Sequence, residues 1–126
     1  MPFLKRAGQP TLHYALDDFT DPWRNAPYLI LQHGYGRSGR FWTSWVPYLS
    51  RFFKVVRPDL RGLGQSEIPA DVDRDISVDA YIGDLAALVE TLGGPVHYCG
   101  ESLGGILGMV LAAEHPHLLR TLSLVA

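Results

Sequence analysis

The feature that most constrains the fold is a Gly-x-Ser-x-Gly motif placed between an apolar run and a helical pattern. The apolar run is residues 96–99, the motif is residues 100–104 with Ser102 at its centre, and the helical pattern continues to Pro116. A strand that passes directly into a helix needs a sharp turn, and that turn lifts a serine hydroxyl clear of the sheet in a strained conformation. Gly100 and Gly104 suit the turn because strand and helix pass too close there for a Cβ. The motif therefore predicts a strand-turn-helix unit that presents Ser102.

Short apolar runs alternate with helical patterns along the rest of the chain. The predicted strands are 3–6 and 12–16, which form a hairpin, followed by 28–31, 53–57, 95–100 and 121–126. The predicted helices are 41–49, with its aromatic residues on one side, 78–92 behind an N-cap at Ser77, and 103–115. Residues 17–27 and 67–75 are polar and read as irregular loops. The alternation predicts an α/β fold, a mostly parallel sheet with helices on both faces and an N-terminal antiparallel hairpin.

Three of the predicted strands end in glycine-rich, polar sequence. These loops are residues 32–39, 59–66 and 100–104. In sheets of this class, ligands bind beyond the carboxyl ends of the strands. We therefore expect the three loops to open onto the same edge of the sheet and to form a site there.

The order and spacing of these motifs resemble the α/β-hydrolase family, over essentially the whole chain. The matching residues are His33-Gly34, Asp59-x-Arg61-Gly62-x-Gly64-x-Ser66 and Gly100-Glu101-Ser102-Leu103-Gly104. The resemblance implies that residues 1–126 are the N-terminal part of a single core domain, truncated after the sixth strand and without a cap domain. It also implies a serine hydrolase with Ser102 as nucleophile, acting on a carboxylic ester or lactone through an acyl-enzyme. A dehalogenase of this fold would carry Asp in place of Ser102.

The chemistry implied by the resemblance requires hydrogen-bond donors for the negative charge that develops on the substrate oxygen. One donor is the backbone N–H of Leu103, at the positive end of the following helix. The second, by family resemblance, is the backbone N–H of Tyr35, just after His33-Gly34. The candidate catalytic residues are therefore Ser102, Tyr35 and Leu103, of which only Ser102 acts through its side chain.

Other polar residues near the motifs have structural interpretations. His33 is expected to shape its loop by hydrogen bonding to the backbone, and Asp59 to brace its own loop, as in the family. Glu101 is expected to point away from Ser102 and to line or support the site. Cys99 lies on a predicted buried strand, so we interpret it as a small core residue.

A hydrolase of this kind also needs a general base for the serine and an acid that orients the base. In the family both follow the nucleophile in the chain, so we expect them beyond Ala126. The apolar strand at 122–126 would leave a hydrophobic sheet edge unpaired. We expect the chain alone to be nearly inactive, because loss of the base costs about 10⁶ in kcat in a serine protease. The alternatives are a carbon–carbon bond hydrolase or perhydrolase of the same fold, or a short non-catalytic fragment or binding module.

Composition limits the remaining function classes. The chain of 126 residues is 47% hydrophobic and 19% charged with a formal net charge of −2, so it lacks the basic footprint of a nucleic-acid-binding protein. No apolar stretch is long enough for a bilayer span, and no cofactor or metal site is expected. A single cysteine, Cys99, favours a cytoplasmic setting. The expected partners are a small-molecule ester or lactone and the C-terminal half that completes the fold.

Overall fold

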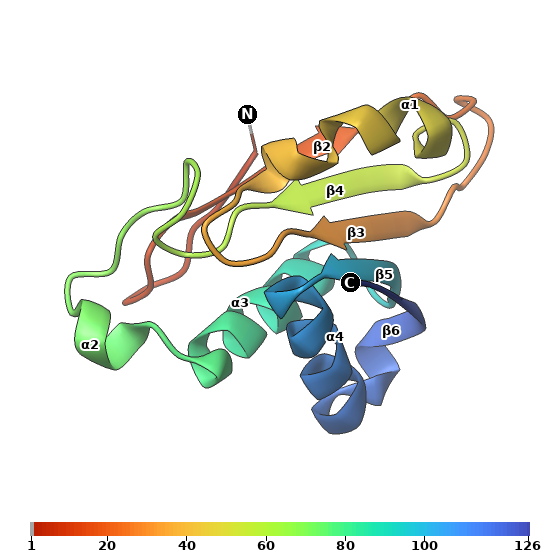
Figure 1. Ribbon diagram of the computed structural model, residues 1–126. Coiled ribbons are helices and arrows are strands. Elements are labelled where there is room, and N and C mark those ends of the chain that lie inside the picture. Colours follow the sequence, from red (N-terminus) through yellow and green to blue (C-terminus); the bar gives the residue numbers. More distant parts are fainter. Residues whose placement is uncertain (1) are drawn as a thin grey trace.

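The computed structural model describes residues 2–126, which form a six-stranded sheet covered by helices on both faces (Figure 1). The strands are β1 (Phe3–Leu4), β2 (Leu12–Asp17), β3 (Tyr28–Gln32), β4 (Lys54–Pro58), β5 (Val96–Glu101) and β6 (Leu119–Val125). The helical elements are the 3₁₀ helix η1 (Gly39–Trp45), α1 (Val46–Leu49), α2 (Val72–Asp75), α3 (Val78–Thr91), α4 (Leu103–Glu114) and the 3₁₀ helix η2 (Pro116–Leu118).

The strand order in the sheet is β1-β2-β4-β3-β5-β6. Strand β2 pairs antiparallel with β1 and with β4, whereas β4, β3, β5 and β6 are parallel neighbours. This arrangement confirms the predicted α/β fold, including its N-terminal antiparallel hairpin. It also places the carboxyl ends of β3, β4 and β5 at one edge of the sheet.

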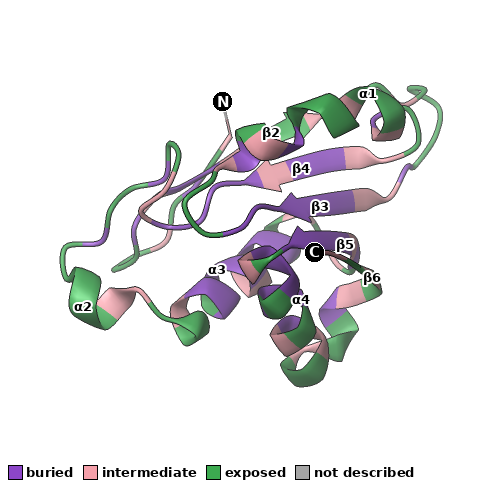
Figure 2. Ribbon diagram, viewed as in Figure 1, coloured by how far each residue is buried: buried purple, intermediate pink, exposed green. Residues whose placement is uncertain are grey.

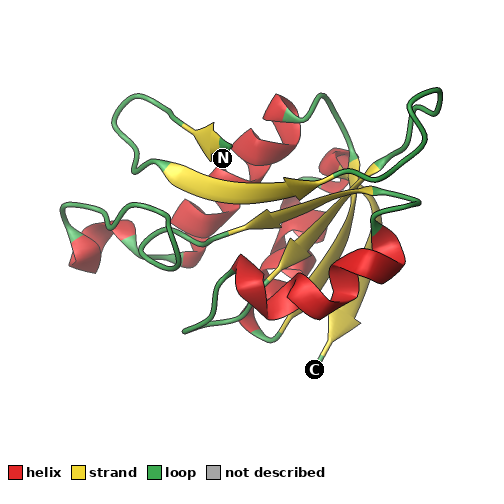
Figure 3. Ribbon diagram, turned by 90° about the horizontal axis from the view of Figure 1, so that it is seen from above, coloured by secondary structure: helices red, strands yellow, loops and turns green. Residues whose placement is uncertain are grey.

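The central strands are largely buried (Figure 2), and their side chains alternate between two hydrophobic cores on opposite faces of the sheet. Ile30, Val56 and Tyr98 face the larger core, together with the apolar sides of α3 and α4. Leu29, Leu31, Val55 and Cys99 face the smaller core, which contains Trp42 and is covered by η1 and α1. The view from above shows these helices on opposite sides of the sheet (Figure 3). Period-two alternation on a parallel sheet therefore produces the layers that the sequence predicts.

Helix α3 forms as the sequence pattern predicts. The Ser77 side chain accepts a hydrogen bond from the Ala80 amide at 3.1 Å, which caps the helix. The chain leaves the helix through Gly93 at a φ of +98°, a conformation that favours glycine. Among residues 2–126, no helix has the length and apolar character needed to cross a membrane.

Two local predictions were wrong. Residues 41–49 are not one regular helix, because the 3₁₀ helix η1 ends at Trp45 and α1 begins at Val46. Pro47, in the first turn of α1, lacks the N–H that a continuous α-helix would need there. Their aromatic residues do cluster, because Trp42 contacts Phe41 and Trp45 edge-on, with ring centroids 5.1 and 4.8 Å apart. The polar segment 67–75 contains the short helix α2, which Asp71 caps by accepting from the Arg74 amide at 3.1 Å. Four residues are too few to show a helical period.

Candidate active site

Ser102 is held in an unusual backbone conformation at the junction between β5 and α4. Its φ is 53° and its ψ is −116°, and among residues 2–126 it is the only non-glycine residue with a positive φ. Its amide donates to the Val125 carbonyl at 3.1 Å, and its carbonyl accepts from the Gly105 amide at 2.9 Å. The backbone is thus tied on both sides. The residue is exposed, and its hydroxyl does not cap the helix that it precedes.

Glycines allow the close approach of strand and helix around Ser102. A Cβ on Gly100 would lie 2.6 Å from the Gly105 amide nitrogen, and a Cβ on Gly104 would lie 2.9 Å from the His33 carbonyl oxygen. Tyr98 adds support from the strand, because its hydroxyl donates to the Gly104 carbonyl at 2.6 Å. Burial raises the pKa of that phenol, so it stays a neutral donor. The predicted strand-turn-helix unit is confirmed.

The loop after β3 passes directly over Ser102. A Cβ on Gly34 would lie 3.1 Å from Ser102 Cβ. The Arg37 amide donates to the Gly34 carbonyl at 3.3 Å, and Gly36 has a φ of +74°, which together form a tight turn with Tyr35 and Gly36 at its centre. The Tyr35 side chain is 78% exposed. The structure therefore brings this turn together with Ser102 and with Leu103, the first residue of α4.

His33 is buried and both ring nitrogens are engaged with the backbone. Nδ1 donates to the Gly34 carbonyl at 2.7 Å, and Nε2 accepts from the Leu60 amide at 3.0 Å. Burial lowers the pKa of the ring, which favours the neutral form that this pairing requires. The prediction that His33 shapes its loop is confirmed.

Asp59 joins the loops that follow β3 and β4. Its carboxylate accepts from the Gly39 amide at 2.7 Å and from the Gln65 amide at 3.0 Å, and it pairs with His13 Nδ1 at 2.8 Å. A Cβ on Gly64 would lie 2.8 Å from Asp59 Oδ1, so this position has no room for a side chain. The expectation that Asp59 braces its loop is confirmed. Sequence reasoning missed its partner His13 on β2, since nothing in the spacing links them.

Glu101 lies directly before Ser102 and is 7% exposed. Its Oε2 would be 2.6 Å from a Cβ on Gly34, which places the carboxylate under the 34–37 turn. Arg37 approaches the same oxygen with Nε at 3.6 Å. This pairing was not predicted, because the sequence gives no signal that connects the two residues.

Comparison with known proteins agrees with this geometry. The family model described as alpha/beta hydrolase fold matches residues 27–126. The chain belongs to the α/β-hydrolase family.

Relatives of this α/β-hydrolase chain are named as hydrolases of different kinds. A 2-hydroxymuconate semialdehyde hydrolase of Pseudomonas sp. (strain CF600) is 37% identical over 77% of the chain and 35% of its own length. A pimeloyl-[acyl-carrier protein] methyl ester esterase of Methylococcus capsulatus is 33% identical over 85% of the chain and 39% of its own length. The crystal structure of the enol-lactonase from Burkholderia xenovorans LB400 superposes with a TM-score of 0.84 and 33% identity, covering 96% of the chain and 45% of that structure. The chain thus spans less than half the length of these relatives.

A buried ion-pair network anchors the loop that follows β4, residues 59–66, in this α/β-hydrolase chain. Arg61 donates to both carboxylate oxygens of Asp84 on α3, at 2.8 and 2.6 Å, and to the carbonyl of Asp75 at 3.0 Å. Arg6 from the N-terminal hairpin reaches the same Asp84. Hydrogen bonding to Asp84 raises the pKa of Arg61, which remains charged. The network fixes the loop after β4 against both the hairpin and α3.

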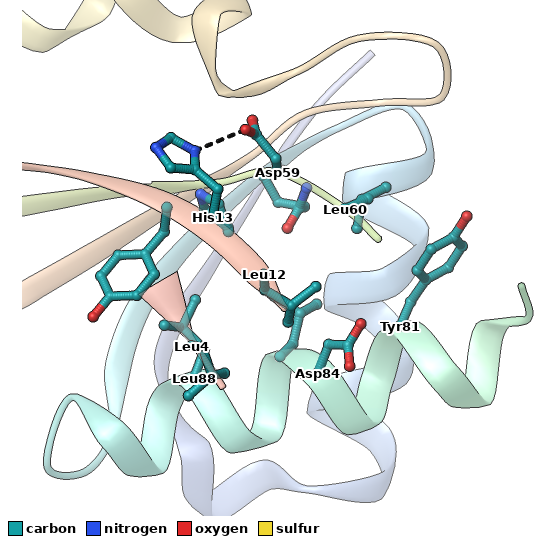
Figure 4. Close-up of a pocket in the computed structure, with 12 residues that line it drawn as sticks. Leu4, Leu12, His13, Asp59, Leu60, Tyr81, Asp84 and Leu88 are labelled. Atoms are coloured by element: carbon teal, nitrogen blue, oxygen red, sulfur yellow. Dashed lines mark hydrogen bonds and ion pairs between the residues drawn. The ribbon is translucent and has the colours of Figure 1, made fainter. Parts of the chain in front are cut away.

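A small cavity lies between β2 and α3 (Figure 4), and Ser102 is not among the residues that line it. Leu4, Leu12, Leu60 and Leu88 are among its lining residues, between β2 and α3, and its volume is about 20 Å³. That volume has room for about one water molecule and excludes an organic substrate. Within residues 2–126 there is no cluster of three or more His, Cys, Asp and Glu side chains that could hold a metal ion. Cys99 is buried as predicted, and burial raises the pKa of its thiol.

Proposed function

We propose that this chain is the nucleophile-bearing part of a serine hydrolase that acts on carboxylic esters or lactones. The observation that carries the proposal is the backbone of Ser102, held at a φ of 53° with its side chain free of the helix cap. A non-glycine residue keeps such a conformation only where its surroundings over-determine it, and such residues gather at functional sites. The close contacts of Gly34, Gly100 and Gly104 supply that constraint here.

In the proposed reaction, Ser102 Oγ attacks the carbonyl carbon of the substrate while its proton passes to a general base. The carbonyl oxygen becomes an oxyanion, to which the backbone N–H groups of Leu103 and Tyr35 donate. Removal of one such donor typically costs about 3 kcal/mol of transition-state stabilisation. The C–O bond then breaks, the leaving alkoxide takes the proton from the base, and the acyl group stays on Ser102. Attack by water on this acyl-enzyme releases the acid and restores the serine.

We place the general base and its acid partner beyond residue 126 or on another chain. The buried rings of His13 and His33 are engaged with Asp59 and with the backbone, respectively. His97 Nδ1 pairs with Thr121 Oγ1 at 2.7 Å within the sheet. Ser102 and His115 flank opposite ends of α4. The 12 residues of this helix separate their backbones by about 18 Å.

The same proposal makes residues 1–126 the N-terminal part of one core domain that is completed by a C-terminal half. Strand β6 is at one edge of the sheet, and Leu124 on it is 53% exposed. A groove of about 330 Å³ on the adjoining sheet face is lined by Leu31, Phe53 and Val125, among others. The greater length of the relatives supports the same arrangement.

The relatives guide the proposed substrate class. A methyl ester esterase and an enol-lactonase are both named for carboxylic esters, the latter for a cyclic one. An ester or lactone is therefore the favoured substrate. The alternatives are a carbon–carbon bond hydrolase or perhydrolase of the same fold, and a non-catalytic fragment.

The test is rapid-mixing hydrolysis of a chromogenic ester, with a lactone and a carbon–carbon bond substrate for comparison. The proposal predicts a burst of alcohol product equal to the enzyme concentration, loss of turnover in Ser102→Ala, and no change in Ser44→Ala, an exposed serine in η1. It also predicts turnover about 10⁶-fold lower for residues 1–126 alone. Turnover in Ser102→Ala equal to that of the unmodified protein would refute the mechanism. Preference for the carbon–carbon bond substrate would favour the first alternative.

A further inference from the structure

The carboxylate of Glu101 is a charged group in a place where it lacks direct hydrogen bonds. The residue is 7% exposed, and within residues 2–126 its Oε2 is buried without a hydrogen-bond partner. Burial of a carboxylate oxygen without a hydrogen-bond partner lowers the stability of the fold, so the presence of Glu101 at this position needs an explanation. The charge that faces it is the guanidinium of Arg37, with Nε at 3.6 Å.

Arg37 is held in place from two sides. Its guanidinium lies 4.5 Å from the centre of the Phe41 ring, in a cation–π contact. Phe41 in turn packs edge-on against the fully buried Trp42, with ring centroids 5.1 Å apart. The side chain is 52% exposed, yet both of its contacts are to elements that border Ser102 or the smaller core.

The ion pair spans the turn that carries Tyr35. Arg37 closes this turn through its own amide, which donates to the Gly34 carbonyl over a rather long 3.3 Å. Glu101 contacts the other end of the turn, because its carboxylate packs against Gly34. The side-chain pair therefore ties both ends of the turn to the residue that precedes the nucleophile.

We propose that Arg37 and Glu101 are positioning residues, whose ion pair fixes the 34–37 turn and so aims the Tyr35 amide at the oxyanion. The proposal rests on the function proposed above for its catalytic consequence, although the effect on the turn itself is independent of catalysis. Loss of either charge frees the turn without removing a group that touches the substrate. The effect therefore falls on kcat, and KM stays nearly unchanged.

The first experiment measures amide hydrogen exchange at residues 34–37 by NMR. In Arg37→Gln and in Glu101→Gln, the exchange rate of the backbone amide of residue 37, relative to its intrinsic rate, is expected to rise about threefold, because a partly exposed ion pair stabilises by about that factor. The double variant should exchange no faster than either single variant, because both remove the same interaction. Arg37→Lys should recover part of the protection, and Arg40→Gln, an exposed charge in the adjoining η1, should have no effect.

The second experiment follows ester hydrolysis in the same variants, with the protein at its full natural length. A fall of about threefold in kcat at constant KM, partly restored in Arg37→Lys, is expected from the same energy. Unchanged exchange at residues 34–37 in both single variants would overturn the inference. If exchange rises while the unmodified protein fails to hydrolyse any ester, the proposed function is wrong and the role of the pair in holding the turn stands.

Discussion

The packing of Gly104 can be tested by Gly104→Ala, in which a gain in helix propensity opposes a loss from overpacking. In a helix, alanine is favoured over glycine by about 1 kcal/mol, so Gly104→Ala should stabilise α4 if nothing else changed. The added Cβ, however, would contact the backbone of Gln32 and lie 2.9 Å from the His33 carbonyl oxygen. Backbone atoms cannot rotate away, so the overpacking cost should reach the upper end of its range, about 3 kcal/mol. The net expectation is a loss of about 2 kcal/mol.

Gly83 in α3 provides the matched control. It is also inside a helix, it is exposed, and a Cβ there would meet no atom within 4 Å. Gly83→Ala should therefore stabilise the protein by about 1 kcal/mol, the propensity gain alone. Urea unfolding followed by tryptophan fluorescence measures both free energies. If the two variants are equally stable, the tight contact between α4 and the end of β3 is not what fixes the position of Ser102.

Three further predictions concern strain, protonation and the buried ion pairs. Ser102→Gly should raise the free energy of unfolding by about 1 kcal/mol, since glycine tolerates the positive φ, while hydrolysis is lost; a less stable variant would contradict the strain. The pKa of His33 is lowered in the folded state from 6.5, so the unfolded chain binds more protons below that pH and stability falls on acidification. Unfolding near pH 7.5 and near pH 5.5 should show a smaller difference in His33→Gln than in the unmodified protein. Arg61→Gln removes the charged partner that donates to both oxygens of the buried Asp84 carboxylate, and should lower the free energy of urea unfolding by about 3 kcal/mol. Arg74→Gln should leave that free energy nearly unchanged, because the Arg74 ion pair is exposed to solvent.

The parts of the fold that could be predicted are those in which short-range pattern and physical cause coincide. The apolar run before Gly100 and the helical spacing after Ser77 both encode elements within a few residues, and both formed as predicted. The helix at 41–49 was wrong in its regularity because apolar spacing does not register the effect of Pro47. Helix α2 was missed, although Asp71 is a common N-cap residue and Asp73 in the first turn is a further helix-start signal that could have been weighed.

The candidate site divides in the same way. The backbone positions of Ser102 and Leu103 follow from local sequence, since a glycine-flanked turn and a helix start define them, whereas Tyr35 was assigned by resemblance to the family. The charged partners do not, because they are brought together only by the tertiary fold. His13 and Asp59 are 46 residues apart and Arg61 and Asp84 are 23 apart. Nothing in the spacing of such residues could indicate these pairs.

The central claim, that Ser102 is the nucleophile, is tested most directly by intact mass before and after treatment with a fluorophosphonate probe. The protein should be taken at its full natural length, with Ser102→Ala and Ser44→Ala as matched variants. The account predicts a mass increase of one probe in the unmodified protein and in Ser44→Ala, with the probe on the peptide that contains Ser102, and none in Ser102→Ala. Labelling of Ser102→Ala to the same extent, or a probe found on another residue, would contradict it.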